Sequence, residues 1–365
     1  MKKIKSNIAF LSLIFILFLP FGSSAQPPQW VLDKYEPHNY LYTYKSEAKE
    51  LAYRLMRPIN FEESKKYPVI ITLHGGTAFR TPNQTARYNI YSLQEYNEQL
   101  ADDAIRTEYP TYVIAPQGKS DQFWIREDLA GLQEIIATLP SVDLNRIYIL
   151  GSSAGGNGVH DFISTDPEYF AAAISAASNP DVINPDKRAN LINFNLWHMV
   201  GEGDVDRNRY SGSVAFFNDM KSRNAKMKFT TFWKIGHSIG GSIIGSEQIY
   251  STYRNGFKTE LAGTNSDPEG DTLKWMFSKS NEQSLGLNNN LLEINIYPNP
   301  TNSIINWSNS LSLDQVIVSN LIGKILLRVN KPTQNSIDLT SFSNGIYMVK
   351  MIKGDRLTVK KIIKK

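Results

Sequence analysis

Between residues 68 and 235, six short apolar runs alternate with stretches that have the pattern of amphipathic helices. Each run is apolar on both faces and ends in a turn signal, which is typical of parallel strands buried between two layers of helices. This alternation predicts an α/β fold with a doubly wound, mostly parallel sheet. Ligands bind such sheets at the carboxyl ends of the strands. The expected strands lie in 67–76, 111–118, 146–156, 169–178, 194–204 and 228–237, and the expected helices in 93–106, 128–139 and 211–224.

The third apolar run ends in Gly151-Ser152-Ser153-Ala154-Gly155, a G-x-S-x-G pattern at an expected strand-to-helix turn. A serine hydroxyl becomes a good nucleophile only when a neighbouring base takes its proton. On such a turn the small residues leave room for a strained backbone, and the acid and the histidine follow the serine along the chain. Ser153 is therefore the candidate nucleophile, and Ser152, one position off the pattern, is the second choice.

Five histidines limit the choice of the base. His38 and His74 precede the serine, His160 lies on the helix after the turn, and His198 lies inside an apolar strand. His237 ends an expected strand among glycines, 84 residues after Ser153. A base that lies on a loop and follows the serine along the chain is therefore expected at His237.

The acid and the oxyanion donors are also expected after strands. The segment WHMVGEGDVDRN offers Glu202, Asp204 and Asp206; Asp204 is preferred, and Asp206 stays open as the alternative. A carboxylate there would orient the histidine. Gly75 and Gly76 end an earlier strand, and the N–H of one of them could form an oxyanion hole with the N–H of Ala154.

These residues lie in motifs that resemble a known family over about residues 40–280. The motifs RLMRPINFEESKKYPVIITLHGG, VIAPQG, GSSAGG, WHMVGEGD and GH are similar to those of secreted α/β-hydrolase esterases. Those enzymes include the feruloyl and acetyl xylan esterases of carbohydrate esterase family one and the polyhydroxybutyrate-depolymerase-like esterases. The resemblance implies Ser153 as nucleophile, His237 as base and Asp204 as acid, with the Gly76 and Ala154 N–H groups as oxyanion donors. The chain departs from the family at the acid motif, which reads Val200-Gly201-Glu202-Gly203-Asp204 instead of His-Gly-x-x-Asp.

The two ends of the chain differ in character from its middle. Residues 1–25 have three lysines, an apolar run and a small-residue site before Gln26, which predicts a cleaved signal peptide. The chain has no cysteine, which excludes disulfides and thiol ligands.

After a polar, Asn-rich stretch, short alternating runs predict a small all-β module. The expected domains are a signal peptide at 1–25, an α/β-hydrolase domain at 26–282, a linker at 283–294 and a β-sandwich at 295–365.

The C-terminal motifs IYPNPTNSIINWS, GKILLRV, IDLTSFSNGIYMVKM and TVKKIIKK resemble the type A C-terminal sorting domain of type IX secretion. The resemblance implies that the type IX secretion machinery is a partner and that the protein reaches the medium or the outer cell surface through the periplasm. The rival interpretation is a carbohydrate-binding β-sandwich. Residues 299–365 hold ten basic and three acidic residues, whereas 26–298 hold 26 basic and 32 acidic residues. The acidic middle gives no indication of nucleic-acid binding.

Three weaker signals complete the set. Asp267, Glu269 and Asp271 stand at alternate positions, a spacing that fits either a calcium site or, preferably, a solvated turn. The aromatic stretches 87–96 and 121–124 could form a substrate platform or pack in the core, and Gln117 could line a pocket.

The sequence thus predicts a secreted serine esterase with a Ser-His-Asp triad and no metal or other cofactor. The expected substrate is an acyl ester, feruloyl or acetyl, on a plant polysaccharide or its fragments. Two alternatives stay open: a serine peptidase of the same fold, and a non-catalytic polysaccharide-binding protein at the cell surface.

Overall fold

The computed structural model describes residues 27–78, 90–119, 124–180, 183–281, 294–307, 312–320, 324–353 and 356–365. The chain divides into two compact units, Met1–Asn281 and Glu282–Lys365. The expected signal peptide at 1–25 and the expected linker, except for Ile294, lie outside the described residues. The domain boundaries drawn from the sequence therefore stay predictions.

A nine-stranded sheet forms the centre of the first unit, in the order β1-β2-β4-β3-β5-β6-β7-β8-β9. The six strands from β4 to β8 in this order run parallel, and the outer strands pair antiparallel. The predicted fold class, a mostly parallel α/β-hydrolase sheet, is confirmed. The strands are β1 Glu36–Tyr44, β2 Glu47–Met56, β3 Tyr67–Leu73, β4 Tyr112–Pro116, β5 Val142–Ser152, β6 Ala172–Ala176, β7 Leu196–Gly201, β8 Met227–Phe232 and β9 Phe257–Leu261.

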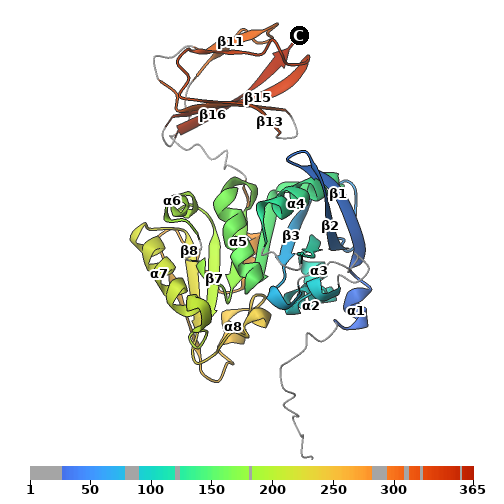
Figure 1. The fold of residues 1–365 in the computed structure, drawn as a ribbon, viewed down its shortest axis with the longest axis vertical. Helices are drawn as coiled ribbons and strands as arrows, with labels where there is room; N and C mark the ends of the chain where they lie inside the picture. The colour runs from blue at the N-terminus through green and yellow to red at the C-terminus, as the bar shows by residue number, and fades with distance from the viewer. Residues whose placement is uncertain are drawn as a thin grey trace, which may run out of the picture. The chain divides into compact units, whose positions relative to one another are not determined.

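Helices cover both faces of this sheet, and a separate apolar core fills each side (Figure 1). One core contains side chains of α4, α5 and α7, and the other contains side chains of α1, α2, α8 and α9. The α-helices are α1 Gln29–Leu32, α2 Glu95–Leu100, α3 Asp103–Glu108, α4 Arg126–Thr138, α5 Ala154–Thr165, α6 Pro185–Arg188, α7 Arg209–Ser222, α8 Glu247–Tyr250 and α9 Thr272–Phe277. Short 3₁₀ turns are η1 Gly76–Ala78, η3 Pro167–Tyr169, η5 Ala189–Leu191, η6 Asp206–Asn208 and η7 Gly240–Ser242.

The helix expected over 93–106 is two helices, α2 and α3. Asp102 interrupts it because its carboxylate accepts hydrogen bonds from the N–H groups of Ala104 and Ile105 and so caps the start of α3. No helix among the described residues is long and apolar enough to span a membrane.

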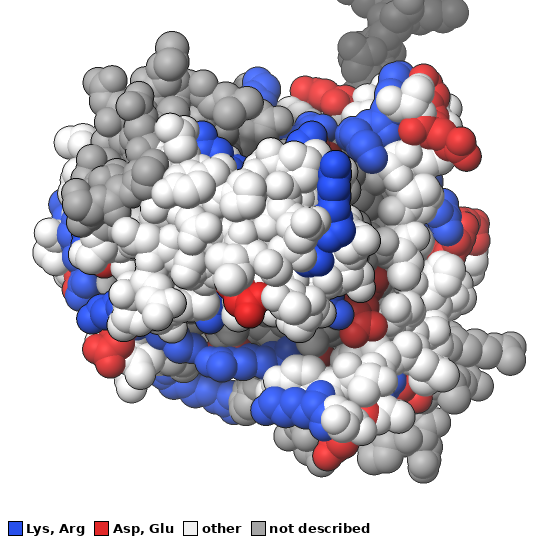
Figure 2. Space-filling model, turned by 90° about the horizontal axis from the view of Figure 1, so that it is seen from above, with Lys and Arg blue, Asp and Glu red and all other residues white. Residues whose placement is uncertain are grey.

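The second unit consists of a three-stranded sheet, β10-β11-β14, and a four-stranded sheet, β13-β12-β15-β16, all antiparallel. Ile305, Trp307, Val316, Val349 and other buried residues form a separate core. Lys and Arg side chains border a broad uncharged area in the view of Figure 2. The strands are β10 Ile296–Tyr297, β11 Ile304–Trp307, β12 Gln315–Asn320, β13 Ile325–Asn330, β14 Ser336–Asp338, β15 Gly345–Lys353 and β16 Arg356–Lys364.

Candidate active site

Ser153 occupies the turn between β5 and α5 in a strained conformation, with φ 58° and ψ −119°. Positive φ is uncommon for a residue other than glycine and persists where the surrounding structure imposes it. Here the Ser153 N–H donates to the Ala176 carbonyl at 2.9 Å, and the Ser153 carbonyl accepts from the Asn157 N–H at 3.0 Å. The turn therefore holds the Ser153 side chain at the carboxyl end of the sheet.

The glycines around the serine are required by close packing of the backbone. A Cβ on Gly155 would overlap the Leu73 carbonyl, and a Cβ on Gly151 would come within 2.7 Å of the Gly155 backbone. Because β3 ends at Leu73, these contacts join the nucleophile turn to the loop that holds Gly75 and Gly76.

The side chains of Ser153, His237 and Asp204 form one hydrogen-bonded series. His237 Nε2 lies 2.9 Å from Ser153 Oγ, and His237 Nδ1 lies 2.7 Å from Asp204 Oδ2. An ionised carboxylate can only accept, so Nδ1 carries the proton and Nε2 is free to accept the hydroxyl proton of Ser153. The Asp204 carboxylate is 2% exposed, whereas the His237 side chain is 42% exposed. The base is therefore open to a ligand while its carboxylate partner is shielded.

Contacts between two loops bring Asp204 and His237 together. The Gly203 N–H donates to the Ile235 carbonyl at 2.9 Å, and the Glu202 carboxylate accepts from the Lys234 N–H at 3.1 Å. A Cβ on Gly201 would overlap the Ile235 carbonyl. The Gly201-Glu202-Gly203 sequence therefore lets the loop after β7 lie directly against the loop after β8. Asp206, the open alternative, begins η6 and is exposed; only Asp204 reaches His237.

The loop after β3 is oriented by a buried histidine. His74 Nδ1 lies 2.8 Å from the Gly75 carbonyl, and its Nε2 accepts from the Gly118 N–H at 2.9 Å. Because the N–H and C=O of a trans peptide point in opposite directions, the Gly76 N–H points away from His74. A Cβ on Gly76 would lie 3.8 Å from the Ala154 Cβ. The Ala154 N–H, first in α5, has no acceptor within its helix. The Gly76 Cβ position thus lies beside Ala154, and Gly76 is exposed whereas Gly75 is buried.

A second serine–histidine pair lies inside the fold. His198 Nδ1 is 2.7 Å from Ser175 Oγ, and its Nε2 is 2.7 Å from Ser213 Oγ. Ser175, His198 and Ser213 have no exposed surface, and burial lowers the pKa of His198 to about 3. A substrate cannot reach this pair. His160, which contacts the His198 ring, is also fully buried, so both histidines belong to the core.

The weaker sequence signals have mostly structural roles. Trp124 is buried, donates to the His74 carbonyl at 3.1 Å and packs against the His74 ring, so it is no substrate platform. Gln117 is 4% exposed and donates to the Ala78 carbonyl, so it supports η1 instead of lining a pocket. Tyr96 is buried, and the Tyr91 side chain is 37% exposed. Residues 87–89 and 121–123 lie outside the described part of the chain.

The carboxylates considered for calcium already have partners. Asp267 pairs with Lys279 and accepts from the Glu269 N–H, while Glu269 accepts from the Asp271 N–H. Asp271 caps α9 through the N–H groups of Leu273 and Lys274. Within the described ranges, no group of three or more His, Cys, Asp and Glu side chains is arranged to hold a metal ion.

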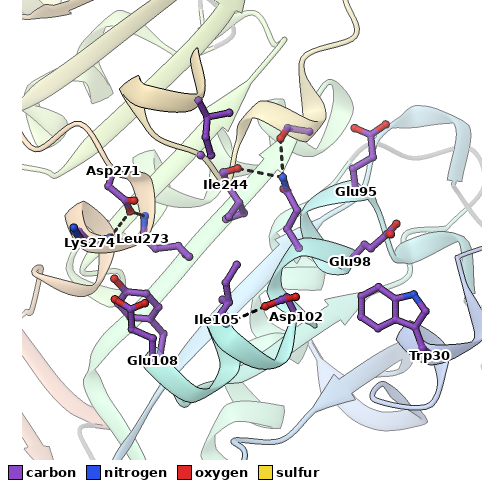
Figure 3. Close-up of a pocket in the computed structure, with 15 residues that line it drawn as sticks. Trp30, Glu95, Glu98, Asp102, Ile105, Glu108, Ile244, Asp271, Leu273 and Lys274 are labelled. Carbon is purple, nitrogen blue, oxygen red and sulfur yellow. Dashed lines mark hydrogen bonds between the residues drawn. The ribbon is translucent and has the colours of Figure 1, made fainter. Parts of the chain in front are cut away.

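Sequence reasoning missed two features of the site. The first is Arg209, whose Nη1 lies 3.0 Å from Asp204 Oδ1. The second is a groove of about 790 Å³ between α2, α3 and the loop after η7 (Figure 3). The groove has no local signal because segments distant in the sequence form it. Arg209 lies only five residues after Asp204, but its contact depends on the left-handed turn at Arg207 and Asn208, which the sequence pattern does not reveal.

One residue that lines the groove, Glu95, lies close to Gly240 near the nucleophile turn, whereas Ser153, Asp204 and His237 are not among the lining residues. A Cβ on Gly240 would lie 3.1 Å from Glu95 Oε2 and 3.7 Å from Ser152 Oγ, and Glu95 and Gly241 line the groove. Its lining combines apolar and acidic side chains, and the Trp30 ring at one side is 43% exposed (Figure 3). The lining residues are Trp30, Glu95, Glu98, Gln99, Asp102, Ile105, Glu108, Tyr109, Gly241, Ile244, Gly245, Ile249, Asp271, Leu273 and Lys274.

Residues 121–210, which include Ser153 and Asp204, match the prolyl oligopeptidase family. Residues 295–365 match the secretion system C-terminal sorting domain, which directs export across the outer membrane to the cell surface or the medium. The second unit therefore carries the sorting domain that the sequence motifs predict. No curated protein shows significant similarity to the chain.

Solved structures with a similar fold include esterases and peptidases. A thermostable esterase is 22% identical with a TM-score of 0.50; the match covers 68% of this chain and 64% of that chain. A ferulic acid esterase from Anaeromyces mucronatus is 13% identical with a TM-score of 0.46, covering 57% and 86%. The acylaminoacyl peptidase of Pyrococcus horikoshii is 18% identical with a TM-score of 0.41, covering 57% and 39%. The chain thus spans less than two thirds of the thermostable esterase, with which it shares the α/β-hydrolase fold.

Proposed function

We propose that the protein is an exported serine hydrolase that cleaves carboxylic esters. The observation that carries this proposal is the hydrogen-bonded series from Asp204 through His237 to Ser153, at the carboxyl ends of three strands. A nucleophile, an exposed base and a shielded carboxylate in this order are the parts that acyl transfer requires.

In the proposed reaction, Ser153 Oγ attacks the ester carbonyl carbon while His237 Nε2 takes the hydroxyl proton. The tetrahedral oxyanion is held by the N–H groups of Gly76 and Ala154. Collapse expels the alcohol, which receives its proton from His237, and leaves an acyl group on Ser153. Water, deprotonated by His237, then attacks this acyl group and releases the carboxylic acid. Asp204 keeps the imidazole oriented throughout, and no cofactor takes part.

The proposed substrate is a feruloyl or acetyl ester on a plant polysaccharide. Export to the cell surface or the medium is compatible with a polymeric substrate outside the cell. The motif resemblance to feruloyl and acetyl xylan esterases supports the same class of substrate. The groove beside Ser152 offers space for sugar units, with the exposed Trp30 ring as a stacking surface and Glu95 and Glu98 as acceptors for hydroxyl groups.

The test is hydrolysis of p-nitrophenyl acetate by residues 26–365, compared with Ser153→Ala. We expect turnover by the wild type and a loss of roughly 10³-fold or more in kcat for the variant, because nucleophilic attack is removed. Ser152→Ala is the matched control and should keep most of the activity. Acetylated and feruloylated xylan follow as polymeric substrates. A folded wild type that turns over none of these esters would refute the esterase, and polysaccharide binding would then be measured.

The second candidate is a serine peptidase, because residues 121–210 match the prolyl oligopeptidase family. The same triad could attack amides. Peptidyl p-nitroanilides assayed in parallel separate the two functions: a kcat/KM for anilides above that for esters would favour the peptidase.

A further inference from the structure

The Asp204 carboxylate has a second partner besides His237. Arg209 Nη1 donates to Asp204 Oδ1 at 3.0 Å, while Oδ2 accepts from His237. The carboxylate is 2% exposed and the Arg209 side chain 13%. Asp204 therefore lies between a cation and the imidazole, with one oxygen committed to each.

The position of Arg209 is determined by a tight turn after Asp204. Arg207 and Asn208 both adopt left-handed conformations, with φ 51° and 55°, and they turn the chain back at the start of α7. The Tyr210 N–H then donates to the Asp204 carbonyl at 3.0 Å. Asn179 anchors the same turn from the β6 side by donating to the Arg207 carbonyl at 3.2 Å. Several independent contacts thus keep the guanidinium beside Asp204.

This arrangement opposes the ordinary preference of a helix terminus. Arg209 is the first residue of α7, where the helix dipole disfavours a cation, and no acidic residue occupies the first turn. An ionised carboxylate next to the guanidinium compensates for that cost. The compensation is mutual, because a buried carboxylate whose only neighbour is a neutral imidazole would be an unpaired buried charge.

We propose that Arg209 is a positioning residue of the triad. Its guanidinium neutralises Asp204 in the resting enzyme, where His237 is neutral, and holds the carboxylate in the orientation that accepts from His237 Nδ1. Without Arg209, Asp204 would turn toward water, and this change weakens the alignment of His237 with Ser153. The inference rests on the proposed function for its kinetic consequences.

Arg209→Met tests the proposal because it keeps much of the side-chain volume and removes the charge. We expect kcat for p-nitrophenyl acetate to fall by about 10- to 100-fold with KM nearly unchanged, because the triad loses alignment while the groove is untouched. Arg209→Lys keeps the charge and should recover part of the loss. Arg223→Met is the matched control: it removes an arginine of the same helix region that pairs with Asp219 at 2.9 Å, and it should behave as the wild type.

A second readout does not depend on activity. The Nδ1 proton of His237, bonded to a carboxylate, should give a low-field ¹H NMR signal that disappears in His237→Gln. We expect this signal in the wild type and in Arg223→Met, and its loss or upfield shift in Arg209→Met. Circular dichroism establishes which variants fold; if Arg209→Met does not fold, Arg209→Gln is judged by the same criteria.

Unchanged kcat and an unchanged low-field signal in a folded Arg209 variant would overturn the proposal. An equal loss of activity in Arg223→Met would also overturn it, because the effect would then be general destabilisation. If the wild type hydrolyses neither esters nor amides but the signal depends on Arg209, the proposed function fails and the positioning role stands.

Discussion

Three histidines that take no part in the proposed reaction are buried, and their burial has a consequence for stability. Burial lowers the pKa of His74 to about 4, that of His198 to about 3, and that of His160 well below its ordinary value. Histidine in an unfolded chain titrates near pH 6.5. Below that pH the unfolded chain binds more protons than the folded chain, so the free energy of unfolding falls as the pH falls.

The first prediction follows from these shifts. Each buried histidine should remove about 1.4 kcal/mol of stability per pH unit below about pH 6.5. Asp128 has the opposite effect on the free energy of unfolding. Burial raises its pKa to about 6, so between pH 6 and 4 the folded chain binds a proton that the unfolded chain does not. The resulting gain in stability offsets the loss from about one histidine. Urea unfolding at pH 7.5, 6.5 and 5.5 should therefore show a decline, which stability that is constant over this range would contradict.

His160 gives this prediction a specific control. Among the described residues neither of its ring nitrogens has a hydrogen-bond partner. Below pH 6.5, His160→Leu should reduce the dependence of the free energy of unfolding on pH by the contribution of about one proton, because an apolar side chain does not titrate. His38→Ala, which replaces a partly exposed histidine that pairs with Glu36, is the control variant.

At the scale of elements, two lysines stabilise the segment 267–271 that precedes α9. Buried Lys228 donates to the Glu269 carbonyl and lies 3.7 Å from the Trp197 ring centroid, and burial lowers its pKa to about 8. Lys279 pairs with Asp267 and lies over the Trp275 ring. Ammonium groups thus satisfy the oxygens that a calcium ion would otherwise use.

The second prediction concerns this segment. EDTA should leave the melting temperature unchanged, because the carboxylates already have partners. Lys279→Ala should lower stability by about 1 kcal/mol through loss of a part-buried charged hydrogen bond. Lys274→Ala, which replaces an exposed lysine of α9, serves as the control in thermal unfolding. A melting temperature that falls with EDTA and recovers with calcium would restore the metal site.

The whole molecule consists of two units with separate cores. All residues of the proposed triad and the oxyanion donors lie in the first unit. The second unit carries the sorting sequence.

The third prediction follows from that division. Residues 26–281 should fold and hydrolyse p-nitrophenyl acetate with the kcat of the 26–365 chain, because no catalytic residue is lost. In a bacterium with type IX secretion, the full-length precursor should reach the medium or the cell surface, whereas the precursor that ends at residue 281 should stay in the periplasm. Immunoblots of the cell fractions distinguish these outcomes. A kcat that depends on the second unit would refute independence of the two units.

Much of the fold could be predicted because its signals are local. A strand buried on both faces must be apolar throughout, and the turn that carries Ser153 must have small neighbours. The antiparallel hairpin of β1 and β2 was not predicted, because its alternating polar and apolar residues have no turn signal that distinguishes them from a loop. The division of 93–106 at Asp102 depended on a side-chain cap that competes with helical periodicity.

By itself the sequence determined the α/β class, the positions of Ser153, Asp204 and His237 after the ends of three expected strands, and the sorting domain. These properties follow from periodicity and motif, which each segment carries on its own. Only the tertiary structure brought the Asp204 carboxylate, rather than that of Asp206, into hydrogen-bond contact with His237, buried Trp124 in the core, and revealed Arg209 and the groove near Gly240. The Asp204–His237 contact, the burial of Trp124 and the groove depend on segments that are far apart in the chain and meet only after the loops at the carboxyl edge of the sheet have packed together. Arg209 is only five residues from Asp204, and its contact depends on the left-handed turn at Arg207 and Asn208.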